Sequence, residues 1–430
     1  MQFVICYYED EKFDRFYPVT ILRPVYTLRA GIVPLFRRGE RYFPDAEVCL
    51  SARDQISPLL VETFRDHPVN IIKRGDCDIL FINGRIRDYG DLAEAVSEAR
   101  LSTVFTRQGQ TVAVLFKKHL LIEIPLLATQ REYQQLYETE HDHFAPAQTE
   151  ATLYDYCWEI MADIEREITA DFAHLRPGMT TRDDVILQDG AIVVNRDDVY
   201  FDSGVEVRPG AVIDASGGPV FIGCNSRIEA HTAVIGPCYI GPNSVVLAGR
   251  IAASSIGHTC RVGGEVEESI FHCYVNKYHA GFIGHSYIAP WVNFGAMTTN
   301  SDLKNNYSNI RVSINDRAVD TGSIKVGSFV GDHTKFGIGT LLNTGINIGV
   351  CCNILGGTLI ADKEVPSFRW GSSEKYEQYH FDKAIETVRR SVARRNCSLS
   401  DREIDLLRAV ANGAMSKEGA MEFRQAVTSG

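Results

Sequence analysis

Two tracts of the chain place an aliphatic or aromatic residue at every sixth position. The first tract has Ile222, Ile228, Val234, Ile240 and Val246, and a similar run before it has Phe201, Val207 and Ile213. The second tract has Val330, Phe336, Leu342, Ile348, Ile354 and Ile360. A period of six is neither the 3.6-residue period of a helix nor the two-residue period of a half-buried strand. It is the period of a parallel β-helix with three short sides, in which each coil uses roughly 18 residues and points one apolar residue per hexad into its axis.

Small residues around the repeats support this prediction. Glycine follows the apolar residue at Gly223, Gly241, Gly331, Gly337 and Gly349. Corners of such a coil need backbone conformations that suit Gly, Asn and Asp. Small side chains come four places after the apolar residue, where a bulky one would crowd the next coil, at Ser226, Thr232, Ser244 and Thr334. The alternative is a β-sandwich with glycine-rich turns, but its strands would alternate with a period of two.

The first part of the chain mixes the two kinds of regular pattern. Strand-like runs cover Phe3–Tyr8, Asp78–Asn83 and Thr111–Phe116, and a helix-like run covers Asp91–Ala99. This alternation predicts an α/β domain over residues 1–140.

The remaining organisation follows from helical spacing and breaks in the repeat. We expect a helical linker over 141–194, starting in the polar stretch Glu138–Glu150 and continuing as an amphipathic helix over Tyr154–Phe172. The solenoid then occupies 195–365. It departs from strict repetition at Ala252–Ala280 and in a polar segment, Ser301–Thr321.

Helical patterns return after the solenoid. They cover Tyr376–Asn396 and a second helix opened by Ser400–Glu403, which has the form of a capping signal. We expect residues 366–430 to form a helical cap over the open end of the solenoid.

Composition narrows the class of protein. The 430 residues are 45% hydrophobic, as in ordinary globular proteins, and the net charge of −11 opposes nonspecific binding to nucleic acid or an anionic membrane. The chain lacks an apolar run of the roughly 20 residues that a membrane span needs, and its start lacks the basic residues of a secretory signal. The 11 cysteines are odd in number, and Cys224, Cys238, Cys351 and Cys352 fall inside repeat hexads. We therefore expect reduced thiols in a cytoplasmic protein.

The densest polar region of the chain lies in the irregular part of the solenoid. It runs over Asn276–Ser286 and continues in Trp291–Ala296. Hexapeptide solenoids very often serve as acyl transferases, and acyl transfer from a thioester to an amine needs a base that works at neutral pH. Imidazole has a suitable pKa, so His279 is the candidate general base and His285 the competing one.

The repeat region resembles the acetyltransferase half of the bifunctional N-acetylglucosamine-1-phosphate uridyltransferase/glucosamine-1-phosphate acetyltransferase family, and within it a divergent bacterial subgroup of sugar nucleotidyltransferases. The segments that carry the resemblance are Gly263–Val266, Asn276–Gly284, Trp291–Asn293, Asn300–Tyr307 and Gly331–Lys335. The resemblance implies a left-handed β-helix, acetyl-CoA as donor and a homotrimer. It places the catalytic histidine on His279 and sugar contacts on Phe282, Asn293 and either Asn300 or Asn306. We expect Lys277, with Asn293, to orient the sugar phosphate, and the segment Lys304–Tyr307 to close over donor or acceptor. The acetyl-CoA side of the pocket falls on Ala296 and Asp332. A family lysine that contacts the sugar phosphate is replaced around Glu267–Glu268.

The N-terminal part carries a weaker resemblance. The stretch Arg15–Pro24 is similar to the segment after the glycine-rich loop of sugar-1-phosphate nucleotidyltransferases, but Tyr7–Lys12 stands where the glycines are expected. The family's metal-binding aspartate is displaced by Asn83–Arg85. The resemblance leaves Arg15, Arg23 and Arg29 as phosphate contacts, with UTP as substrate and Mg²⁺ as cofactor if the domain is active.

These observations predict a cytoplasmic sugar-nucleotide enzyme, with a nucleotidyltransferase-like domain joined to an acetyltransferase acting on an amino-sugar phosphate. Two alternatives remain open. The first is a zinc-dependent, carbonic-anhydrase-like solenoid with His258, His279 and His285 as ligands. The second is a non-catalytic nucleotide-sugar binding or scaffold protein, favoured by the lost glycine-rich loop.

Overall fold

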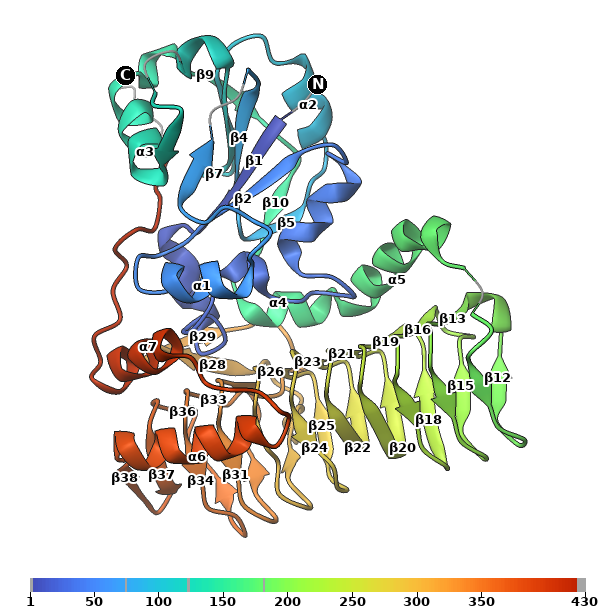
Figure 1. The fold of residues 1–430 in the computed structure, drawn as a ribbon. Helices are drawn as coiled ribbons and strands as arrows, with labels where there is room; N and C mark the ends of the chain where they lie inside the picture. The colour runs from blue at the N-terminus through green and yellow to red at the C-terminus, as the bar shows by residue number, and fades with distance from the viewer. Residues whose placement is uncertain (1–2, 74–75, 122–123, 181, 424–430) are drawn as a thin grey trace.

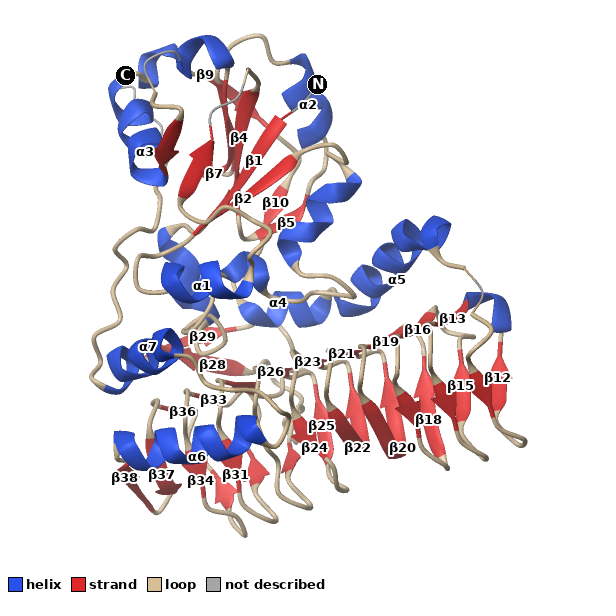
Figure 2. Cartoon of the chain, viewed as in Figure 1, coloured by secondary structure: helices blue, strands red, loops and turns tan. Residues whose placement is uncertain are grey.

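The six-residue repeats form a solenoid with three parallel faces in the computed structural model, which describes residues 3–73, 76–121, 124–180 and 182–423. The N-terminal domain lies above this solenoid, and helices α4 and α5 run between the two (Figure 1). Figure 2 shows the short strands of successive coils stacked in register. The predicted combination of an α/β domain, a β-solenoid and terminal helices is confirmed.

Each face of the solenoid is a ladder of parallel strands. The first face holds β11 (Ile186–Leu187), β14 (Glu206–Val207), β17 (Arg227–Ile228), β20 (Val245–Ala252), β22 (Arg261–Glu267), β24 (Asn276–Lys277), β31 (Lys335–Phe336), β34 (Asn353–Ile354) and β37 (Arg369–Ser372). The second holds the later parts of β20 and β22 with β12 (Ile192–Val194), β15 (Val212–Asp214), β18 (Thr232–Ile235), β25 (Phe282–Gly284), β27 (Thr299–Asn300), β32 (Leu341–Leu342) and β35 (Leu359–Ile360). The third holds β13 (Val199–Phe201), β16 (Val220–Ile222), β19 (Cys238–Ile240), β21 (Ser255–Ile256), β23 (Ile270–Phe271), β26 (Tyr287–Ile288), β30 (Phe329–Val330), β33 (Asn347–Ile348) and β36 (Glu364–Val365).

The apolar residues of the repeat fill the axis of the solenoid. All those predicted from the six-residue period belong to one core, and their exposed fractions lie between 0% and 3%. The small hydroxyl residues do more than leave room for the next coil. Ser226 Oγ donates to the carbonyl of Gly241 (2.8 Å) and Ser244 Oγ to that of Gly257 (2.9 Å), so they tie one coil to the next.

Glycine is required at the coil corners for space as well as for conformation. A Cβ on Gly241 would lie 2.7 Å from the backbone nitrogen of His258 in the following coil. The left-handed residues after Gly223 and Gly241 are Asn225 and Asn243. At this corner glycine is therefore required because the next coil packs closely against it, and not for the predicted conformational reason.

A six-stranded sheet with the order β2-β1-β4-β7-β6-β9 forms the N-terminal domain. Its strands are β1 (Phe3–Tyr8), β2 (Glu47–Ser51), β4 (Asp78–Asn83), β6 (Thr103–Arg107), β7 (Gln110–Phe116) and β9 (Ala145–Gln148). The helices are α1 (Ser57–Thr63), α2 (Leu92–Glu98) and α3 (Gln130–Thr139), and two short pairs join β3 (Ile71–Lys73) to β8 (Leu127–Thr129) and β5 (Ile86–Asp88) to β10 (Thr152–Leu153). Because β9 pairs with β6, the stretch expected to begin a linker belongs to the sheet, and the domain extends past residue 140.

The expected linker helix is two helices, α4 (Cys157–Ala162) and α5 (Ile164–Leu175), which meet at Asp163. Arg87 Nε and Nη2 donate to the Asp163 carboxylate at 2.7 and 2.9 Å, which anchors this junction to the N-terminal domain. The predicted apolar stripe of the helices packs on the third face of the solenoid, in a cluster that includes Ile160, Ile164, Ile168, Tyr239, Ile270 and Tyr287.

The C-terminal helices do not form the expected cap over an open end. The start of the predicted helix is a strand, β38 (Lys375–Gln378), paired with β37, and α6 (Phe381–Ala393) begins only after it. Helix α6 lies along the side of the later coils, and α7 (Asp401–Ala411) packs beside it (Figure 1). Beyond α7 the chain returns to the N-terminal domain, where Met421 and Phe423 are buried. In the described part of the chain, the helices are too short or too polar to cross a bilayer.

Candidate active-site groove and N-terminal pocket

A groove with a volume of about 470 Å³ lies where the first and second faces of the solenoid meet. Its lining residues are Asn276, Tyr278, His279, Asn293, Phe294, Gly295, Ala296, Ile338 and Arg394. The structure thus brings together three residues singled out from the sequence, His279, Asn293 and Ala296.

His279 lies at the corner between β24 and β25 and is exposed. The Tyr278 ring meets its ring edge-on at a centroid distance of 5.2 Å. The corner is fixed from inside by Lys277, whose Nζ donates to the carbonyls of Gly263 (2.7 Å), Gly281 (2.6 Å) and His279 itself (3.2 Å). An exposed imidazole on a rigid corner can accept a proton from an incoming amine.

Two asparagines on successive coils form one wall of the groove. Asn276 Nδ2 donates to Asn293 Oδ1 at 2.8 Å. This bond uses the carbonyl oxygen of Asn293 and leaves its amide N–H groups available to a ligand. The predicted position of Asn293 beside the histidine is therefore compatible with a sugar contact.

Lys277 does not have the ligand-facing position predicted for it. Its side chain is only 2% exposed, and burial lowers its pKa to about 8. With three backbone carbonyls as acceptors, it supports the corner that carries His279 and does not line the groove.

His285 is unsuited to the role of competing base. Its Nδ1 lies 2.8 Å from Asp302 Oδ2 and its Nε2 lies 3.1 Å from Glu268 Oε2. Burial opposes the charged ring, but hydrogen bonds to Asp302 and Glu268 outweigh burial and raise the pKa of His285 to about 9. The ring is therefore protonated at neutral pH and cannot accept a proton there.

The other predicted sugar contacts lie away from the groove lining. Asn300 is buried, where its Nδ2 donates to the Gly284 carbonyl (3.0 Å) and its Oδ1 accepts from the Gly284 N–H (2.9 Å). Phe282 is half-buried on the second face. Lys304 Nζ donates to the carbonyl of Asn309 (2.5 Å), and Asn306 Oδ1 accepts from the Ser308 N–H (3.1 Å).

The polar insertion that contains Lys304 and Asn306 continues into a hairpin, β28 (Arg311–Ile314) and β29 (Arg317–Asp320). Ile310, Val312 and Ile314 pack in the cluster that joins the N-terminal domain to the solenoid. The insertion therefore holds the two parts of the chain together, where the sequence predicted closure over a ligand.

Two predicted ligand contacts bind each other. Arg23 was expected to contact phosphate and Asp332 to lie on the acetyl-CoA side, but Arg23 Nη1 donates to Asp332 Oδ2 at 3.0 Å and Arg23 Nη2 pairs with Asp332 Oδ1. Both side chains are largely buried, so this ion pair joins the N-terminal domain to the solenoid. Arg29 likewise contacts the solenoid, with its guanidinium 5.1 Å from the centre of the Tyr239 ring.

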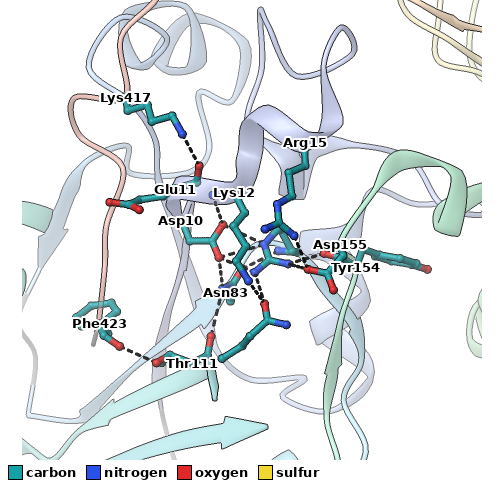
Figure 3. A network of polar contacts seen from close by, with 12 residues as sticks. Asp10, Glu11, Lys12, Arg15, Asn83, Thr111, Tyr154, Asp155, Lys417 and Phe423 are labelled. Carbon is teal, nitrogen blue, oxygen red and sulfur yellow. Dashed lines mark hydrogen bonds and ion pairs between the residues drawn. The ribbon is translucent and has the colours of Figure 1, made fainter. Parts of the chain in front are cut away.

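A second candidate pocket, of about 400 Å³, lies at the carboxyl ends of β1 and β4. Its lining residues are Tyr8, Asp10, Glu11, Lys12, Asn83, Arg85, Thr106, Gly109, Gln110, Thr111, Met421, Glu422 and Phe423. Parallel strands commonly present ligand sites at these ends. Figure 3 shows the polar network around it. Arg15 lies at its margin and pairs with Asp155 (3.3 Å).

Arg85 is the centre of this network. Its Nε and Nη2 donate to Asp10 Oδ1 (2.9 Å) and Oδ2 (2.7 Å), and Nη1 donates to the Tyr154 carbonyl (2.5 Å). Although burial favours the neutral acid, Arg85 and Asn83 hold the pKa of Asp10 below its ordinary value. Asp10, in the stretch that replaces the glycine-rich loop, therefore forms an internal ion pair with Arg85.

These contacts bear on the metals expected from the sequence. Mg²⁺ is usually held through one or two carboxylates, and Asp10 already binds Arg85 through both oxygens. In the described ranges, the His, Cys, Asp and Glu side chains do not form a group of three that could hold a metal ion. The histidines of the zinc alternative do not form such a group among the described residues, and both ring nitrogens of His285 contact carboxylates.

Two contributions to these sites were missed in the sequence. Arg394, at the end of α6, lines the groove of His279, and Met421–Phe423 line the N-terminal pocket. Both come from parts of the chain far from their sites in sequence. For Arg394, the sequence offered one signal, the consecutive arginines at the end of a predicted helix. For Met421–Phe423 it offered none.

Residues 5–180 match the sugar nucleotidyl transferase family model. This sugar nucleotidyl transferase-like region covers the sheet and helices α4 and α5. The bifunctional sugar-1-phosphate nucleotidylyltransferase/acetyltransferase of Sulfurisphaera tokodaii is 31% identical over 96 residues, 22% of this chain and 24% of that protein. The bifunctional protein GlmU of Methanococcus vannielii is 29% identical over 135 residues, 31% of this chain and 30% of that protein. The resemblance inferred from the sequence is confirmed.

The chain spans about a quarter to a third of the length of these curated relatives. Among solved structures, an Arabidopsis UDP-N-acetylglucosamine acyltransferase matches with a TM-score of 0.22 and 13% identity, over 48% of this chain and 75% of that one. That likeness is too weak to support an assignment.

Proposed function

We propose that the protein is a sugar-nucleotide biosynthesis enzyme whose solenoid transfers an acetyl group from acetyl-CoA to the amine of an amino-sugar phosphate. The observation that carries the proposal is the groove in which an exposed histidine, His279, lies beside Asn293 and Ala296 on adjoining coils. The confirmed resemblance to bifunctional nucleotidyltransferase/acetyltransferases supports it.

In the proposed reaction the amine attacks the thioester carbonyl directly. His279 accepts the proton that the amine loses, and Asn293 donates hydrogen bonds to the sugar. The new amide C–N bond forms as the C–S bond breaks, and the thiol of coenzyme A leaves. Backbone N–H groups at the coil corners can stabilise the oxyanion that develops. Lys277 keeps the His279 corner in place from below.

The test compares His279→Ala with His231→Ala, which removes an exposed histidine from the corresponding corner between β17 and β18. A general base contributes about 10²–10⁴-fold to a rate. We therefore expect His279→Ala to lose at least about 100-fold in kcat for acetylation of glucosamine-1-phosphate, with unchanged circular dichroism. Undiminished turnover in this variant would reject the assignment of the base.

For the N-terminal domain we propose sugar-1-phosphate nucleotidyltransferase-like recognition of UTP or a nucleotide sugar in the pocket at the ends of β1 and β4. A second candidate, binding without turnover, is favoured by the Asp10–Arg85 ion pair where a phosphate-binding loop and metal ligand are expected. A screen that pairs UTP and Mg²⁺ with sugar-1-phosphates separates the two. Pyrophosphate release supports turnover, and binding of a UDP-sugar without release supports the second candidate.

We further propose a homotrimer in the cytoplasm, as expected for hexapeptide solenoids of this kind. Ile338 and Tyr278, which are 73% and 47% exposed at the edge of the groove, are apolar surface that a neighbouring subunit would cover. Sedimentation analysis of the purified protein tests the trimer, and a monomer across micromolar concentrations would exclude it.

A further inference from the structure

The acetyl-transfer groove needs a cationic group, because the residue predicted to orient a substrate phosphate is buried. Lys277 donates to three carbonyls and does not line the groove. Glu267 and Glu268 stand where the resemblance places a lysine that contacts the sugar phosphate. A phosphorylated substrate in this groove therefore needs cations from elsewhere.

The C-terminal end of helix α6 brings Arg394 to the groove and Arg395 to a smaller pocket beside it. Arg394, which caps the helix, lines both the His279 groove and a smaller pocket next to it. The lining of that smaller pocket is Tyr274, Asn276, Trp291, Val292, Asn293, Ser391, Arg394 and Arg395. The linings of the two spaces share Asn276, Asn293 and Arg394, so the two spaces adjoin at the asparagine wall.

The cations around this smaller pocket have no neutralising carboxylate. Among the described residues, Arg261, Arg394 and Arg395 form no ion pair, whereas Arg390 of the same helix pairs with Glu386 at 2.5 Å. Burial, and then the charge of Arg395, lower the pKa of Arg261. Like charges held together without counterions form a binding site for an anion.

Part of the lining of this pocket is aromatic. Tyr274 and Trp291 occupy the same corner of successive coils, both with left-handed backbone, and their rings stack at 4.1 Å and 8°. Tyr274 and Trp291 therefore give the pocket that also holds Arg394 and Arg395 a fixed aromatic surface.

We propose that Arg394 and Arg395 at the C-terminal end of α6, in the pocket that Tyr274 and Trp291 also line, form a phosphate subsite adjoining the groove that contains His279. This inference rests on the proposed acetyl transfer. The phosphate is that of the amino-sugar acceptor or one of the phosphates of the CoA donor, and both offer the same chemistry to a guanidinium.

The experiment compares Arg394→Gln/Arg395→Gln with a matched control on the same helix, Arg389→Gln/Arg390→Gln. Both variants remove two positive charges, but the control pair lies outside the linings of the groove and of the smaller pocket. We expect KM to rise at least about tenfold in the first variant, with a much smaller change in kcat, since hydrogen bonds to charged groups are strong. A rise in the KM of glucosamine-1-phosphate identifies the acceptor phosphate, and a rise in the KM of acetyl-CoA identifies the donor. Unchanged KM values for both substrates would overturn the proposal.

A binding measurement separates failure of this subsite from failure of the proposed function. Inorganic pyrophosphate and CoA are titrated calorimetrically into the wild type and both variants. Weaker binding of either probe to Arg394→Gln/Arg395→Gln alone supports the subsite even if the wild type acetylates none of the amino sugars tested. Equal binding of both probes to the wild type and both variants would overturn it, whatever the acetylation assay shows. Matched thermal melts guard against loss of fold.

Discussion

Replacing Phe423 with alanine tests whether the last described residues belong to the core of the N-terminal domain. The Phe423 side chain is 3% exposed, and its ring lies 5.1 Å from the rings of both Tyr8 and Tyr137 in nearly perpendicular contacts. Thr111 Oγ1 donates to the Phe423 carbonyl at 2.6 Å, and the Met421 N–H donates to the Glu9 carbonyl at 2.8 Å. The tail is thus held at the end of β1 by backbone and side chain.

The expected loss can be worked from these contacts. Burial of a phenylalanine contributes about 1.5–3 kcal/mol, and each aromatic pair adds about 0.5–1.5 kcal/mol. A core Phe→Ala change costs about 3–5 kcal/mol. Here the tail can detach from the N-terminal domain, so the loss cannot exceed the free energy with which the tail docks. We therefore expect about 3 kcal/mol, which for a domain of this size lowers Tm by roughly 6–12 °C.

Differential scanning calorimetry measures the melting of the N-terminal domain, and hydrogen exchange of the Met421 amide reports docking directly. The control is Tyr307→Ala, because Tyr307 is 68% exposed and its removal should change stability by no more than about 0.5 kcal/mol. A Phe423→Ala protein that melts with the wild type and keeps its Met421 amide protected would refute the reasoning.

Three further predictions concern buried charges. Because contacts with Asp302 and Glu268 raise the pKa of His285 to about 9, above its unfolded value, the stabilisation is complete below about pH 6.5 and is lost as pH rises through 9. His285→Gln should cost roughly 3 kcal/mol at pH 6 and little at pH 10 in urea unfolding, and a pH-independent loss would contradict this. Lys277→Met should cost about 2–3 kcal/mol by leaving buried carbonyls without a donor, while the KM for the amino sugar stays near wild type. Arg23→Ala and Asp332→Ala should each cost about 3–5 kcal/mol and the double variant less than their sum; simple additivity would show that the pair is not coupled.

The solenoid could be predicted because its rule is local and repeated. Each hexad must place one apolar residue on the axis, so the period is visible in residues such as Ile228 and Ile348, both fully buried. The boundaries predicted for the linker helix and for the first C-terminal helix were less accurate. Asp163 interrupts α4 and α5 through a contact with Arg87, and β38 forms because β37 is available to pair with it. Neither partner is near in sequence.

The candidate site was predictable only in part for the same reason. His279, Asn293 and Ala296 are close in sequence and lie on adjoining coils, so they meet in the groove. Lys277 and Asn300 have the residue types of ligand contacts, yet both satisfy backbone groups of the coils. The pairing of Arg23 with Asp332 joins residues from opposite ends of the fold. This ion pair depends on how the N-terminal domain packs on the solenoid, which local sequence patterns do not specify.

The route of the tail has a consequence for biosynthesis. Residues Tyr8, Phe81 and Phe116 are translated more than 300 residues before Phe423, the ring that packs against them. Domains generally fold in order during synthesis, and a domain that waits exposes apolar surface meanwhile. The N-terminal sheet therefore stays incompletely packed until residues 421–423 have been translated, and during that interval part of its apolar surface is exposed.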